Sequence, residues 1–146
     1  MAKKPVRACV IEAPCKINIH LSIGEKSPDG FHSLESLFAS LAFCDTLRFE
    51  RSGKAGECLL AMNYEAPMDE IKRENNLVFK AVSLFRERAG FNEGLNIRVD
   101  KRIPAGAGLG GGSSDAASAL LALNSLAGTA LSMEELREME RGELLP

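Results

Sequence analysis

The strongest chemical signal in the sequence is a glycine-rich segment from Pro104 to Ala116, which reads PAGAGLGGGSSDA. Five of the seven residues from Gly106 to Gly112 are glycine, a density that costs chain entropy on folding. Amides without neighbouring Cβ atoms can converge on an anion, and the N-terminus of a following helix adds unpaired N–H groups and a partial positive charge. The segment therefore predicts a loop that binds phosphate.

The two serines after the glycines fit the same interpretation, because the hydroxyls of Ser113 and Ser114 can cap a helix, contact phosphate oxygens or help to hold a Mg²⁺-bound nucleotide. A plain chain turn needs only one or two glycines. Three of the glycines also match the G-x-G-x-x-G pattern of dinucleotide-binding folds, but the helix that follows leads to another helix and not to a strand with an acidic end. A Walker loop is excluded because no lysine follows the glycines.

A second polar group lies near the N-terminus, where apolar and polar residues alternate from Lys16 to Ile23. The alternation predicts a half-buried strand whose polar face carries Asn18 and His20. Residues 24–30 contain Pro-Asp-Gly and favour a tight turn, so we expect the chain to reverse before Phe31 and His32.

The remaining pattern predicts the elements that must position these residues. Asn76 can cap a helix that ends near Gly90, and Ser132 with Glu135 forms a capping box for a short final helix. A helix is also expected from Ser113 through about residue 127. Strands are expected at residues 6–11, 46–50, 57–62 and 95–99, while residues 34–43 are ambiguous between helix and strand. The prediction is one α+β domain with an antiparallel-rich sheet.

Composition narrows the possible partners. The chain has 146 residues and a formal net charge of −2, so it has no basic field to attract nucleic acid or an anionic membrane. No apolar run reaches the length of a membrane span, and the N-terminus does not resemble a secretion signal. Its four cysteines form no C-x-x-C pair, which favours a reduced, cytoplasmic protein.

Longer motifs make the chain resemble a known family. The segment from Pro104 to Ala116 is similar to the second motif of the GHMP kinases. Residues 13–21 (APCKINIHL) and 28–34 (PDGFHSL) resemble the opening of the 4-diphosphocytidyl-2-C-methyl-D-erythritol kinase family. The similarity continues in order to about Met139, through Leu37-Phe38, Asp45-Thr46-Leu47, Glu74-Asn75-Asn76-Leu77 and Asp100-Lys101-Arg102-Ile103-Pro104.

This resemblance implies a fold and an activity. The fold is the GHMP kinase N-terminal domain, which is similar to domain 2 of ribosomal protein S5 and has a mixed sheet packed on one face by helices. The activity is transfer of the ATP γ-phosphoryl group, with Mg²⁺, to the 2-hydroxyl of the cytidyl-linked methylerythritol in the non-mevalonate isoprenoid pathway. Such a reaction depends on positioning and charge compensation more than on covalent chemistry by the protein.

The resemblance also assigns roles to individual residues. Lys16 is the active-site lysine, close to the acceptor hydroxyl. Asn18, Phe31 and His32 contact the substrate, with Phe31 where the family usually has tyrosine, so that stacking is kept and a hydroxyl is lost. No residue is assigned as a metal ligand. The residues assigned to the nucleotide are Asn76, Lys101, Pro104, Gly106, Gly108, Leu109, Gly110, Gly111, Gly112, Ser113 and Ser114.

One departure from the family pattern affects the expected activity. Family members carry a catalytic aspartate in a Gly-Ala-Asp-Val-Pro-like segment after the final helix, whereas residues 139–146 here read MERGELLP. The resemblance therefore implies that residues 1–146 form a truncated N-terminal domain, incomplete at its C-terminus and without the C-terminal domain. Apolar faces would then be exposed, and a homodimer would cover them. The alternatives are a non-catalytic nucleotide-binding fragment and an S5-like nucleic-acid-binding module, and the acidic charge balance disfavours the second.

Overall fold

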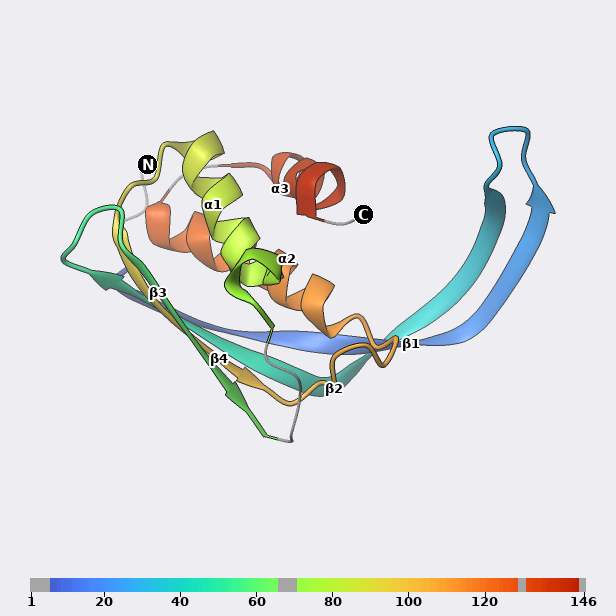
Figure 1. The fold of residues 1–146 in the computed structure, drawn as a ribbon, viewed down its shortest axis with the longest axis horizontal. Coiled ribbons are helices and arrows are strands. Elements are labelled where there is room, and N and C mark those ends of the chain that lie inside the picture. Colours follow the sequence, from blue (N-terminus) through green and yellow to red (C-terminus); the bar gives the residue numbers. More distant parts are fainter. Residues whose placement is uncertain (1–5, 66–70, 129–130, 145–146) are drawn as a thin grey trace.

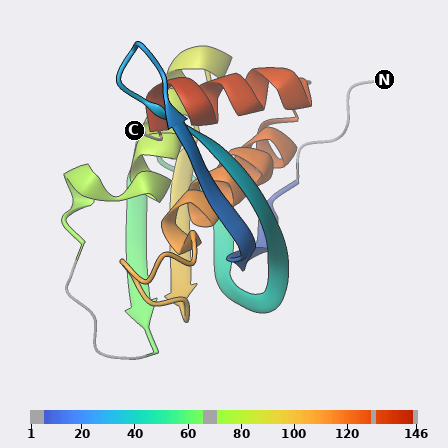
Figure 2. The same ribbon diagram turned by 90° about the vertical axis from the view of Figure 1, so that its right-hand side faces the viewer.

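The computed structural model describes residues 6–65, 71–128 and 131–144. One four-stranded sheet carries the helices on a single face (Figures 1 and 2). The predicted mixed sheet packed on one face is therefore confirmed. In chain order the elements are β1 (Ala8–Lys26), β2 (His32–Ser52), β3 (Cys58–Tyr64), η1 (Arg73–Asn75), α1 (Leu77–Ala89), β4 (Gly94–Lys101), α2 (Gly111–Ala127), α3 (Met133–Met139) and η2 (Glu140–Leu144).

The strand order is β1-β2-β4-β3, and the pairing explains where the predicted phosphate loop lies. β1 pairs with β2 and β2 with β4 in antiparallel fashion, while β3 runs parallel to β4 because η1 and α1 cross over between them. The ambiguous residues 34–43 belong to β2. The glycine-rich segment thus connects the end of a central strand directly to a helix on the covered face.

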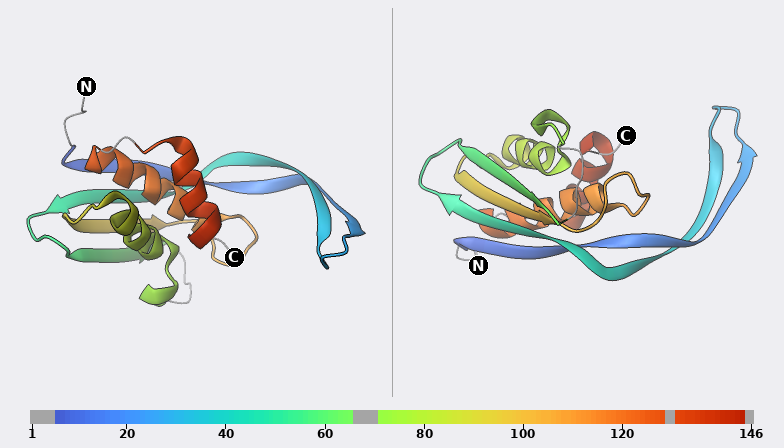
Figure 3. Two further views of the ribbon diagram at one scale, coloured as in Figure 1. Left: turned by 90° about the horizontal axis from the view of Figure 1, so that it is seen from above. Right: turned by 60° about the horizontal axis from the view of Figure 1, so that its bottom comes forward.

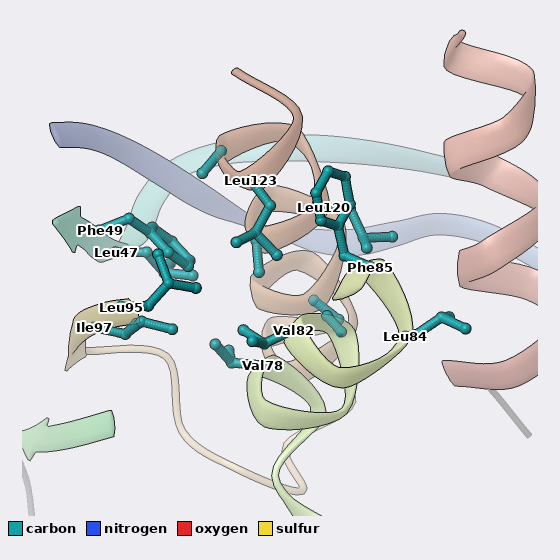
Figure 4. Packing of buried hydrophobic residues seen from close by; sticks show 14 of the residues in the cluster. Leu47, Phe49, Val78, Val82, Leu84, Phe85, Leu95, Ile97, Leu120 and Leu123 are labelled. Atoms are coloured by element: carbon teal, nitrogen blue, oxygen red, sulfur yellow. The ribbon is translucent and has the colours of Figure 1, made fainter. Parts of the chain in front are cut away.

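The hydrophobic core lies between the sheet and the first two helices (Figure 4). The apolar side chains of α1 are largely buried, whereas Leu121 on α2 is 39% exposed. α2 contacts α1 as well as β1 and β2, so its buried face contains Ala119, Leu120 and Leu123 and leaves Leu121 toward solvent. The main side chains of this core are Leu47, Phe49, Val78, Val82, Phe85, Leu95, Ile97, Leu120 and Leu123.

Three helix ends follow the local sequence signals, and the start of α2 does not. Asn76 caps α1, Gly90 ends it in a left-handed conformation with φ 64°, and Ser132 forms the predicted capping box with Glu135. The expected start of α2 at Ser113 is wrong. The helix begins at residue 111, with Gly110 at φ 71° as the N-cap and without a side-chain cap, so the loop's own backbone makes the entry.

The β1–β2 hairpin continues past the body of the domain as a bent arm (Figures 1 and 3). Irregular pairing between Pro14 and Lys16 marks the point where it leaves the covered sheet. The predicted strand from Lys16 to Ile23 is confirmed as part of β1, but its predicted half burial is wrong: Ile23 is 65% exposed, and so is Phe38 on β2. Apolar and polar residues do alternate along this part of β1, but the helices pack against the body of the domain and leave both faces of the arm uncovered. Coverage of these residues by a second copy stays a prediction.

Candidate phosphate-binding site

Three of the five glycines are required by backbone geometry. Gly106, Gly108 and Gly110 have φ values of 71°, 73° and 71°, in the left-handed region that other residues adopt only with strain. The loop therefore alternates left-handed residues with ordinary ones until the amide of Ser114 donates to the Gly110 carbonyl at 2.9 Å and α2 begins. Backbone that alternates in this way can direct successive amides to one side and form a concavity that binds an anion.

Close packing requires a glycine at position 111. A Cβ atom at Gly111 would lie 2.8 Å from Cγ2 of Ile103, whereas one at Gly112 would lie 3.4 Å from Cδ1 of Leu77, an ordinary van der Waals contact. The first residue of α2 thus packs tightly against the exit from β4. A side chain at position 111 would push the helix N-terminus away from the loop.

A cavity of about 360 Å³ opens between the loop and the N-terminus of α1. Of the eleven residues assigned to the nucleotide, all except Ser114 line it. The sequence did not indicate the apolar side chains that complete the wall, because they come from β3, from α1 and from the segment before η1. These are Met62, Ile71, Leu77 and Val78.

Asn76 lines this cavity while its side chain is engaged in the protein. Its Oδ1 accepts hydrogen bonds from the amides of Val78 at 2.9 Å and Phe79 at 3.3 Å, and its Nδ2 donates to the sulfur of Met62 at 3.4 Å. The residue therefore fixes the start of α1 against β3. Its role as a helix cap is established by these contacts, whereas contact with a nucleotide stays a prediction.

Lys101 is buried below the loop and is held by two carboxylates. Its Nζ donates to Oδ2 of Asp45 and, at 2.7 Å, to Oδ2 of Asp115. The second oxygen of Asp45 accepts the amides of Arg102 at 2.5 Å and Ile103 at 2.8 Å. These are the amides that β4 leaves unpaired as it exits the sheet. We call Asp45, Lys101 and Asp115 the ion triad.

Burial and mutual attraction set the protonation of the ion triad. Burial alone lowers the pKa of Lys101, but Asp115 and Asp45 outweigh it, so the net pKa is raised and the ammonium stays charged. Burial raises the pKa of Asp115 to about 7 despite the neighbouring ammonium. Near neutral pH the triad therefore alternates between a neutral form and a form with one net negative charge.

Lys16 lies where the arm, the body and the loop meet. Its amide donates to the carbonyl of Leu109 at 2.9 Å, and a Cβ atom at Gly110 would lie 3.2 Å from Lys16 Cγ. Its Nζ donates to Oδ1 of Asn18 at 3.4 Å, and the hydroxyl of Ser36 donates to the same oxygen at 3.3 Å. The structure thus brings Lys16 and Asn18 beside the loop, outside the lining of the cavity.

Phe31 and His32 are not brought to the loop. They lie at the turn between β1 and β2, at the far end of the arm (Figure 1). The Phe31 side chain is 75% exposed, and Nδ1 of His32 donates to the carbonyl of Gly24 at 3.0 Å. These two predicted substrate residues share a surface with each other but not with the cavity.

Two properties of the described residues concern metal binding and membrane insertion. Within residues 6–65, 71–128 and 131–144, no three or more histidine, cysteine or acidic side chains are grouped so as to hold a metal ion. Over the same part of the chain, no helix is both long and apolar enough to cross a membrane. All four cysteines are free thiols.

No local sequence signal marks Asp45 as part of this site. It precedes the loop by more than fifty residues and was quoted only within a three-residue family motif. Its burial depends on the pairing of β2 with β4, which places it opposite the end of β4. A buried carboxylate of this kind becomes recognisable only when the strand register is known.

Comparisons with known proteins agree with this geometry. Residues 76–143 match the family of the GHMP kinase N-terminal domain. The chain is 45% identical over 127 residues to the chloroplastic 4-diphosphocytidyl-2-C-methyl-D-erythritol kinase of Oryza sativa subsp. japonica, covering 86% of this chain and 31% of that protein. It is 42% identical over 127 residues to the kinase of the same name from Shewanella baltica, covering 87% of this chain and 43% of the relative.

Solved structures give the same assignment. A crystal structure of 4-(cytidine 5'-diphospho)-2C-methyl-D-erythritol kinase superposes with a TM-score of 0.70 at 39% identity, over 90% of this chain and 46% of that one. Homoserine kinase from Cytophaga hutchinsonii shares the fold, with a TM-score of 0.71 at 20% identity over 94% of this chain and 41% of that one. The chain spans less than half the length of these relatives. The chain therefore has the fold of the GHMP kinase N-terminal domain, and in sequence it corresponds to the N-terminal portion of the 4-diphosphocytidyl-2-C-methyl-D-erythritol kinases.

Proposed function

We propose that this chain serves the ATP-dependent phosphorylation of the 2-hydroxyl of 4-diphosphocytidyl-2-C-methyl-D-erythritol and contributes the seat for the ATP phosphates. The observation that carries the proposal is the glycine loop itself, with left-handed Gly106, Gly108 and Gly110 leading into the N-terminus of α2 beside a cavity. Relatives at 42% and 45% identity are named as kinases of this substrate, which supports the choice of acceptor.

The residues present fit a nucleotide phosphate. The packing at Gly111 leaves no room for a Cβ atom, and the first amides of α2 have no side-chain cap to compete for them. A helix N-terminus of this kind stabilises negative charge through its unpaired N–H groups and its dipole. ATP supplies the phosphoryl group, and Mg²⁺ enters with the phosphates of the nucleotide. The role of the protein here is to orient the phosphates and to offset their charge.

Lys16 is proposed as the catalytic cation. Its amide is fixed by the Leu109 carbonyl, while its Nζ has a single long hydrogen bond, 3.4 Å, to the side chain of Asn18. The backbone is therefore held to the phosphate loop and the ammonium keeps donors for an incoming oxygen. A positive charge at this place stabilises both a transferring phosphoryl group and the alkoxide that forms on the acceptor.

The arm is proposed as the substrate side of the site. Asn18 at its base presents an amide, and Phe31 and His32 at its tip present an aromatic face and an imidazole to solvent. Such groups suit a cytosine ring, which stacks on aromatic side chains and forms hydrogen bonds along its edge. Because the tip lies away from the loop, these two residues would recognise the cytidyl end and not the reacting hydroxyl.

A second candidate function is nucleotide binding without catalysis. The observation in its favour is that this function needs only the glycine loop and the adjoining cavity, both of which the described residues contain. The four free thiols fit a reducing compartment under either function and support the cytoplasm as the location.

The experiment titrates the purified chain with ATP·Mg²⁺ by calorimetry and then assays phosphoryl transfer to 4-diphosphocytidyl-2-C-methyl-D-erythritol. We expect saturable binding of ATP·Mg²⁺ that a Lys16→Met variant retains, because the loop amides are backbone groups. Formation of the phosphorylated product that is lost in Lys16→Met would establish the kinase function. Binding without product in both proteins would assign the second function, and absence of binding would refute both.

A further inference from the structure

The ion triad below the glycine loop has an unbalanced charge and an unused hydrogen-bonding atom. With both carboxylates ionised, Asp45 and Asp115 share a single ammonium, that of Lys101. The side chains of all three are at least nine-tenths buried. Oδ1 of Asp115 is buried and has no hydrogen-bond partner in the described structure. A buried carboxylate oxygen without a partner is costly, so this atom requires an explanation.

The ion triad is also close to the proposed phosphate seat. Lys101 and Asp115 both line the cavity below the loop. Nζ of Lys101 lies 3.5 Å from the point where a Cβ atom of Gly111 would stand, at the first residue of α2. Negative charge on the triad therefore lies at the floor of a cavity that, on the proposed function, receives a polyanion.

We propose that binding of a nucleotide polyphosphate at the glycine loop is coupled to the uptake of a proton by Asp115. The inference rests on the proposed function and adds how the site balances its charge. Without the proton, the phosphates would approach a buried cluster of net charge −1; with it, the cluster is neutral and Lys101 remains cationic. Two anions close together in a weakly screened interior disfavour each other, and protonation of the weaker acid removes the conflict.

The hydrogen bonds of the ion triad decide which carboxylate takes the proton. Asp45 accepts three hydrogen bonds, from Lys101 and from the amides of Arg102 and Ile103, so both of its oxygens are engaged. Among the described residues, Asp115 accepts a hydrogen bond from Lys101 at Oδ2 and also interacts with Asp45, and its unpartnered Oδ1 is free to carry a proton. The pKa of Asp115, raised to about 7 by burial, agrees with this choice.

Few other titratable groups face Asp115. The charged groups that act on it are Lys101 from β4 and Asp45 from β2. β1 packs against α2 and carries the buried thiol Cys15 and, beside the loop, Lys16. The part of α1 that lines the same cavity is uncharged, namely Asn76 at its cap followed by Leu77 and Val78. The proton uptake is therefore assigned to a single carboxyl group.

The test measures ATP·Mg²⁺ binding by calorimetry at about pH 7.5 in two buffers of different ionisation enthalpy. If the bound phosphates raise the pKa of Asp115 by about one unit, binding takes up about half a proton at this pH. The affinity for ATP·Mg²⁺ then falls about tenfold between about pH 6 and pH 9. An Asp115→Asn variant removes this uptake, makes the affinity independent of pH over the same range, and binds more tightly than the wild type at the alkaline end.

The matched control is Asp100→Asn, the same chemical change at the β4 residue that precedes Lys101. The carboxylate of Asp100 pairs with Arg98 on the exposed side of the sheet, and hydrogen bonding to Asn63 and Arg98 lowers its pKa, so it does not titrate in this range. Subtracting the proton uptake of Asp115→Asn from that of the wild type also removes the protons that ATP itself exchanges on binding. The comparison of the two buffers is made on the wild-type protein and does not depend on the folding of any variant. If ATP·Mg²⁺ binds and the proton uptake of wild type and Asp115→Asn is the same, the inference is overturned and the proposed function stands. If ATP·Mg²⁺ does not bind at any pH, the proposed function is refuted and the inference falls with it.

Discussion

Replacement of Gly110 by alanine tests the phosphate loop directly. Gly110 has φ 71° and is the N-cap of α2, and an added Cβ atom would lie 3.2 Å from Cγ of Lys16. The left-handed conformation costs a non-glycine residue about 1–2 kcal/mol. The contact with Lys16 is tight but falls on a flexible side chain, which can give by a few tenths of an ångström. Because the strain opposes the conformation that presents the amides, we expect ATP·Mg²⁺ affinity to fall about 5-fold to 30-fold.

Three further alanine variants separate the causes. Gly106→Ala has the same positive φ but an open surrounding, so it reports strain without the Lys16 contact. Gly111→Ala has no such φ, but its Cβ atom would meet Ile103 at 2.8 Å, so it reports displacement of α2 alone. Gly53→Ala, in the turn after β2, has open space and no left-handed φ, and is the control for a glycine replaced elsewhere.

The assay is calorimetric titration of each variant with ATP·Mg²⁺, with circular dichroism to verify folding. The expected order of affinity places wild type and Gly53→Ala together, Gly106→Ala below them, and Gly110→Ala at or below Gly106→Ala. Wild-type affinity in a folded Gly110→Ala would refute the reasoning, because it would mean that the left-handed loop conformation is not the one that binds phosphate.

Three other predictions concern stability and the groups around the cavity. Burial raises the pKa of Asp115 to about 7, so between about pH 4 and pH 7 the folded protein binds more protons than the unfolded chain. As the pH rises through this window, the free energy of unfolding of the wild type should fall by up to roughly 4 kcal/mol relative to that of Asp115→Asn. Urea unfolding at several pH values measures this, and a constant difference would contradict it. Asn76→Ala removes two hydrogen bonds at the start of α1 and should cost about 1–2 kcal/mol, whereas an unchanged urea midpoint would show that water replaces the cap. Ser132→Ala breaks the capping box and should cost about 1 kcal/mol by the same measurement, with no loss of ATP·Mg²⁺ affinity because α3 does not line the cavity; reduced affinity would argue against that separation.

Local chemistry made part of this structure predictable. The caps at Asn76 and Ser132 and the left-handed glycine after α1 follow from interactions within a few residues, and the sequence predicted all three. The glycine loop was predictable for a related reason, because so many glycines together indicate backbone that takes positive φ values or approaches a ligand closely. Its place between a strand and a helix followed from the patterns on each side.

Features that depend on distant residues were not predictable in the same way. The alternation in β1 indicated a buried face, but burial requires a partner layer, and the arm lies beyond the helices. The parallel direction of β3 beside β4 is set by the crossover through η1 and α1, which the local pattern of β3 does not encode. The ion triad joins β2, β4 and α2, so the roles of Asp45 and Asp115 could not be deduced before the register was known.

The hydrogen bond between the Lys16 amide and the Leu109 carbonyl joins two regions that are far apart in the chain. Side chains alternate between the two faces along a strand. Deleting one residue from β1 just after Lys16 would therefore move the side chains of the outer part of the hairpin to the opposite face. Deleting one residue just before Lys16 would in addition displace the Leu109 carbonyl, which accepts the hydrogen bond from the Lys16 amide. Engineering of the two regions is therefore asymmetric: the hairpin beyond Lys16 can be redesigned on its own, but the segment that precedes it cannot be changed in length without reshaping the turn that faces the cavity.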